Sequence, residues 1–83
     1  MLTKIFNFLF PKIVKAKRHK DDGLMFIYYS NGKRKIFQGS GLSWIRLEDS
    51  KLCGSKMIDF LSRIEIKMNK IKTDYVDLTK ENI

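Results

Sequence analysis

Apolar residues near the C-terminus recur at alternating intervals of four and three positions, the spacing of one face of a helix. The residues of this stripe are Met57, Leu61, Ile64, Met68, Ile71, Tyr75 and Leu78. Ser55 is a suitable N-cap, so the pattern predicts one long helix over residues 55–78 and a short tail at 79–83. Ile58 and Phe60 widen the first half of the stripe, as expected for a helix that packs on a sheet.

The second half of this helix would carry a narrower seam of Met68, Ile71, Tyr75 and Leu78. A helix over residues 55–78 is about 36 Å long, whereas a strand of seven residues is about 23 Å long. We therefore expect roughly two turns to extend beyond the sheet and to offer the seam as an interface to a protein partner or a second copy of the chain. An alternative is that residues after 72, which are rich in β-branched and aromatic side chains, form a short strand or a docked tail.

A β-hairpin is predicted over residues 24–38, where two strand-like runs flank Asn31-Gly32. Asn-Gly supplies both positive-φ positions of a two-residue type I′ turn. That turn would place Tyr28 opposite Lys35 and Tyr29 opposite Arg34, with an exposed tip that is aromatic and cationic.

The remaining pattern completes an α+β fold in a single domain over residues 1–83. Residues 13–54 are expected to form a three- or four-stranded antiparallel β-meander packed against the one long C-terminal helix. Its first strand would start at residue 13, where lysines alternate with apolar residues as on a protected edge strand. A further strand is expected at 42–47.

Residues 1–12 form the most apolar segment, and Leu2, Ile5, Phe6 and Leu9 share one helical face. We expect a short N-terminal apolar helix that caps the core. The segment is far shorter than the ~20 apolar residues that cross a bilayer. An alternative is peripheral membrane association through residues 1–20, because a basic run follows the apolar face.

Charge is distributed unevenly along the chain. The formal net charge is +8, and residues 1–35 hold nine Lys or Arg against two Asp, whereas residues 36–83 are nearly balanced. This asymmetry favours a polyanionic partner, and the alternative is a solvated lysine-rich surface. A single cysteine excludes an intrachain disulfide and is typical of a reducing, cytoplasmic setting.

Catalytic chemistry is not predicted. Cys53 precedes the expected helix, but His19, the one histidine, lies in a separate segment, so we expect a buried cysteine and no nucleophile–base pair. Gly39-Ser40-Gly41 is too short for a phosphate-binding loop. We expect no enzyme activity, cofactor, metal site or small-molecule substrate.

The remaining constellation combines cations with aromatic rings. Its members are Lys15, Lys17, Arg18, Lys20, Tyr28, Tyr29, Lys33, Arg34, Lys35 and Trp44. Cations contact phosphates or acidic surfaces, and flat rings stack on exposed bases. The residues therefore predict a small basic interaction module that uses the helix seam and a cationic hairpin face.

Other functions remain open at this point. One alternative is sequence-tolerant binding of RNA or single-stranded DNA, although no RNP-type motif is present. A second is inhibition of a host protein, since the Lys-, Ile- and Asn-rich composition has the style of small phage or mobile-element proteins.

Overall fold

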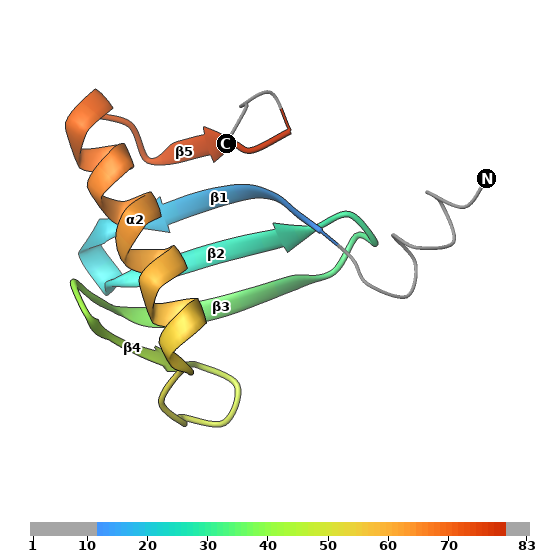
Figure 1. The fold of residues 1–83 in the computed structure, drawn as a ribbon, viewed down its shortest axis with the longest axis vertical. Coiled ribbons are helices and arrows are strands. Elements are labelled where there is room, and N and C mark those ends of the chain that lie inside the picture. Colours follow the sequence, from blue (N-terminus) through green and yellow to red (C-terminus); the bar gives the residue numbers. More distant parts are fainter. Residues whose placement is uncertain (1–11, 80–83) are drawn as a thin grey trace.

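The computed structural model describes residues 12–79. In chain order its elements are β1 (Ile13–His19), a 3-10 turn η1 (Lys20–Asp22), β2 (Leu24–Tyr29), β3 (Arg34–Ser40), β4 (Ser43–Arg46), α2 (Ser55–Ile71) and β5 (Tyr75–Asp77). The five strands form one antiparallel sheet in the order β4-β3-β2-β1-β5 (Figure 1). The expected α+β class, a meander packed on a helix, is confirmed, with five strands where three or four were predicted.

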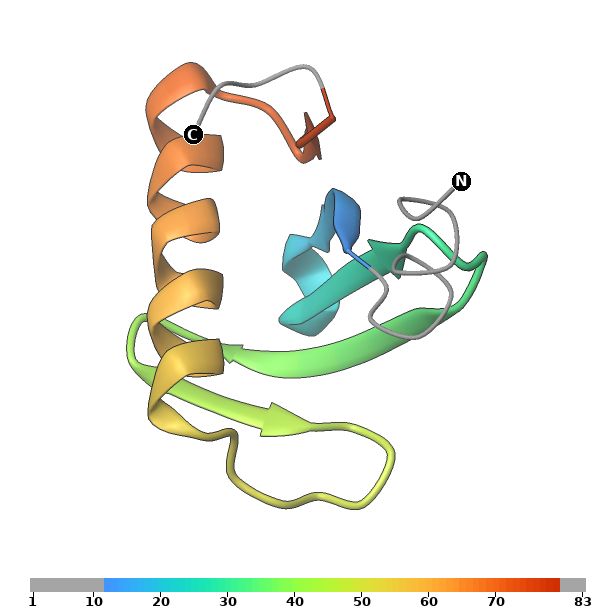
Figure 2. The same cartoon turned by 45° about the vertical axis from the view of Figure 1, so that its right-hand side comes forward.

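The helix α2 packs across one face of the sheet, so the fold has two layers, the sheet and the helix (Figures 1 and 2). Alternate residues of the strands point toward it and form the core. The largest fully buried side chains are Trp44, Phe37, Met25, Ile27, Leu61 and Met68. The predicted N-terminal helix lies outside the described residues, apart from Lys12 at its end.

The helix ends earlier than the apolar stripe predicts. Lys72 adopts a left-handed conformation (φ 55°, ψ 50°). The Thr73 N–H then donates to the Met68 carbonyl at 2.9 Å, which closes the last turn. The prediction of a helix to residue 78 is therefore wrong, and the alternative of a short strand describes this segment.

The helix ends early because the segment that follows it pairs with the edge strand β1 of the sheet. Without β5, the outer side of β1 would expose a row of unpaired backbone groups. β5 pairs with it in antiparallel register, with Ala16 opposite Val76, and both side chains are buried. Val76 is not part of the apolar stripe, so the stripe does not reveal this pairing.

The seam predicted as an interface does not exist as one surface. Met68 is in the core, with 1% of its surface exposed. Tyr75 and Leu78 follow the helix rather than belonging to it, and Ile71, at the helix end, is 56% exposed. Leu61, Ile64 and Met68 of the apolar stripe are thus buried in the core, and the helix ends at Ile71, before the turns that were expected to extend beyond the sheet.

The hairpin turn also differs from the prediction by one residue. The Tyr29 N–H donates to the Lys33 carbonyl, so the loop holds three residues, and only Gly32 of the Asn31-Gly32 pair has positive φ (84°). This is the geometry of a turn closed by a glycine in the left-handed region. The register places Tyr28 opposite Arg34 and Ile27 opposite Lys35. Because side chains alternate between faces, a shift of one changes which rings and cations share a face.

Candidate functional site

One face of the sheet is not covered by α2, the α-helix of the described residues (Figure 2). Strand alternation and the observed registers align its side chains in rows across the strands. One row runs from Tyr75 through Lys17 and Phe26 to Ile36. The next row runs from Asp77 through Lys15 and Tyr28 to Arg34. We call this surface the open face, defined by Lys15, Lys17, Phe26, Tyr28, Arg34 and Tyr75.

Cations lie over the rings of the open face. The Lys15 ammonium is 4.8 Å from the centre of the Tyr28 ring, and the Arg34 guanidinium carbon is 5.4 Å from that of Phe26. At surface sites each such contact contributes about 0.5–1 kcal/mol. A ligand phosphate can therefore draw these cations from the rings at small cost.

The rings are only partly covered. Phe26 and Tyr28 are half-buried, and Tyr75 is 47% exposed. These two rows hold three cations and one acid. The cations are Lys15, Lys17 and Arg34, and the acid is Asp77. The surface therefore combines a positive field with flat apolar groups.

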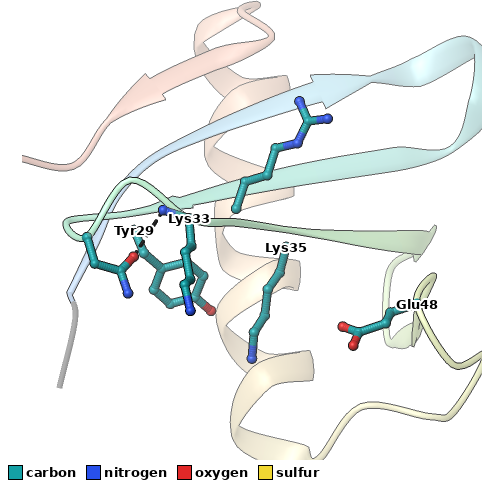
Figure 3. Close-up of a pocket in the computed structure, with 6 residues that line it drawn as sticks. Tyr29, Lys33, Lys35 and Glu48 are labelled. Carbon is teal, nitrogen blue, oxygen red and sulfur yellow. Dashed lines mark hydrogen bonds between the residues drawn. The ribbon is translucent and has the colours of Figure 1, made fainter. Parts of the chain in front are cut away.

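A second group of cations lies at the hairpin tip on the helix side of the sheet. Lys33, just before β3, and Lys35 in β3 project on the same side beside Tyr29 (Figure 3). Glu48 faces them across a cleft of about 430 Å³. The Lys35 ammonium is 5.9 Å from the centre of the Tyr29 ring. Burial raises the pKa of the Tyr29 phenol from its ordinary value, because it disfavours the charged phenolate.

Protein-family models, curated proteins and solved structures contain no match to this chain. The function therefore has to be inferred from the chemistry of these surfaces.

Two residues predicted for the binding surface belong to the core instead. The buried Arg18 donates through Nη2 to the Gly39 carbonyl at 2.9 Å and to Glu65 Oε2 at 3.0 Å. Its guanidinium carbon lies 4.9 Å from the ring centre of the fully buried Trp44. Arg18 and Trp44 thus bind the helix to the sheet and are not available to a ligand.

Glu65 and the β3–β4 turn complete this partly buried network. The second carboxylate oxygen of Glu65 accepts from the Gly41 N–H at 2.8 Å, and the Trp44 indole donates to the Gly41 carbonyl at 2.9 Å. Gly39 also has no room for a side chain, because a Cβ there would lie 1.8 Å from the Ser43 carbonyl oxygen. The turn is therefore held closely against the helix.

The structure separates the remaining predicted site residues. Lys15, Lys17, Tyr28 and Arg34 meet on the open face, whereas Tyr29, Lys33 and Lys35 line the cleft at the tip. Lys20 is in η1, where it makes an exposed ion pair of 3.6 Å with Asp74. Phe26 and Glu48 were not predicted as site residues. The alternation of β2 and the one-residue change in register are the signals that place Phe26 beside Arg34.

Nucleophilic and metal chemistry find no support in the described residues. Burial raises the pKa of the Cys53 thiol, while Arg46 lowers it and Asp49 raises it. A raised pKa disfavours the thiolate that a nucleophile needs. Across residues 12–79, no three His, Cys, Asp or Glu side chains are grouped so that they could hold a metal ion. Nor is any helix in that range long and apolar enough to span a membrane.

Proposed function

We propose that this protein is a non-enzymatic module that binds nucleic acid through the open face, with a preference for unpaired strands and little for sequence. One observation carries the proposal: three cations alternate with three aromatic rings on the face that α2 leaves uncovered. Cations neutralise phosphates, and exposed rings stack on bases of any sequence, since every base has a π-face.

The spacing of the rings supports the preference for unpaired strands. Phe26 and Tyr28 are two residues apart on β2, which corresponds to about 7 Å. Successive bases in a duplex strand are only about 3.4 Å apart. Neighbouring bases must therefore leave their stack to reach both rings, which an unpaired strand does more easily than a duplex.

An acidic protein is the second class of partner that the basic surface suits. That function was predicted with an interface on the helix seam, but Met68 is buried in the core and Tyr75 and Leu78 lie beyond the end of the helix. The rings between the cations favour nucleic acid over an acidic protein as the partner. An acidic protein surface requires only complementary charge, whereas bases also use the rings.

The proposal is tested by titrating labelled oligothymidylate, oligouridylate and a duplex with the protein at several salt concentrations. We expect tighter binding to the unpaired strands and a steep loss of affinity with salt. In the variant Lys15→Gln/Lys17→Gln/Arg34→Gln, loss of three phosphate contacts should lower the log–log salt slope by about 2.

The matched control is Lys51→Gln/Lys56→Gln/Lys70→Gln, which removes the same charge from exposed positions in the β4–α2 loop and on the helix. This control should retain most of the affinity. Absence of binding to every nucleic acid at low salt, with retention of an acidic protein from a nuclease-treated extract, would refute the proposal. Equal losses in both triple variants would show that only net charge matters.

A further inference from the structure

The edge of the sheet is open where the open face meets the hairpin tip. β4 pairs with β3 only from Phe37 to Ser40, and the next contact is the Leu47 N–H, which donates to the Ile36 carbonyl at 3.0 Å. Arg34 and Lys35 pair with β2 on one side and have no strand on the other among the described residues. The sheet therefore has a notch beside these two residues.

The backbone of Arg34 points into this notch. The Lys33 carbonyl accepts from β2, whereas the Ile36 carbonyl accepts from the β4 side. Because these directions alternate along a strand, the N–H of Arg34 points outward, away from β2. An outward backbone N–H next to cationic side chains is a suitable donor to a phosphate oxygen.

Side chains continue the positive charge around the notch. The Arg34 side chain lies on the open face, over Phe26. Lys33 and Lys35 project to the other side, beside Tyr29 (Figure 3). Two clefts of about 430 and 340 Å³ meet here, and Arg34, Lys35 and Glu48 line both of them. A row of cations thus passes from Lys15 through Arg34 to Lys35 and Lys33.

We infer that the notch is a phosphate site for the same nucleic-acid strand, whose backbone leaves the open face at Arg34 and turns around the edge of β3. This inference rests on the proposed function. A short strand is held by the open face alone, and a longer strand gains the contacts with Lys35, Lys33 and the Arg34 N–H. Glu48 lines the same clefts and repels a phosphate placed there.

The test compares oligothymidylates of about four and about twelve nucleotides. Wild-type protein should bind the longer strand much more tightly. In Lys33→Gln/Lys35→Gln the affinity for the short strand should be nearly unchanged. The gain from length should shrink, and the salt slope for the long strand should fall by about 1.4. Lys56→Gln/Lys70→Gln, with the same change in net charge, is the control.

Glu48→Gln is a second variant, and its expected effect on affinity is opposite to that of the lysine variant. Removing its negative charge should tighten binding of the long strand several-fold and leave the short strand unaffected. The inference is overturned if the paired lysine variant weakens both lengths equally or neither, or if Glu48→Gln has no length-dependent effect. If wild-type protein binds neither strand, the proposed function itself fails, which is a distinct result.

Discussion

Arg18 and Lys17 are neighbours in sequence, yet their side chains serve opposite faces of the sheet. Lys17 is exposed on the open face, whereas Arg18 is buried and paired with Glu65, with side-chain exposures of 7% and 15%. The Nη1 atom of Arg18 is buried and has no hydrogen-bond partner among residues 12–79. A buried charge of this kind depends on its partner, because removing one member leaves the other uncompensated.

We predict that Glu65→Ala destabilises the fold by about 3–5 kcal/mol, since it leaves the Arg18 guanidinium unpaired. Asp59→Ala on the same helix removes an exposed ion pair with Arg63 and should cost no more than about 0.5 kcal/mol. Urea unfolding followed by circular dichroism measures both. Similar free energies of unfolding for the two variants would show that the Arg18 network contributes no more than a surface pair.

At the scale of elements, the sequence predicts best what local periodicity determines. The hairpin strands and the first part of the helix follow from alternation and from the apolar stripe. The helix end does not, because Ile71, Tyr75 and Leu78 continue the stripe by position while the edge of β1 recruits Val76 into the sheet. Asn31-Gly32 likewise fits both a two-residue and a three-residue loop, and the pairing of the whole strands decides between them.

The helix end yields a prediction with a definite sign. Lys72 is a non-glycine residue at positive φ, a conformation that costs an L-residue about 1 kcal/mol. Lys72→Gly should therefore stabilise the protein by up to about that amount. If the helix continued to residue 78, the same change would destabilise it by about 1 kcal/mol. Thermal unfolding distinguishes these outcomes by the direction in which the midpoint moves.

At the scale of the molecule, the two faces of the sheet have different roles. The face under α2 holds the core, including Phe37 and Trp44, and the opposite face combines rings with cations. Composition predicted that the first half of the chain would be basic, but only the tertiary register shows which cations meet on one surface. Rows that cross several strands depend on pairings between residues distant in sequence. The sequence alone therefore does not show which side chains share one face of the sheet.

The most direct test of the central claim is a map of backbone amide chemical shifts as an unpaired oligothymidylate is added to the isotope-labelled protein. We expect the largest changes at the open face, at Lys15, Lys17, Phe26, Tyr28, Arg34 and Tyr75. Amides on the outer side of α2, such as those of Lys56 and Arg63, should move little. Changes concentrated on α2, or no changes at all at low salt, would contradict the account.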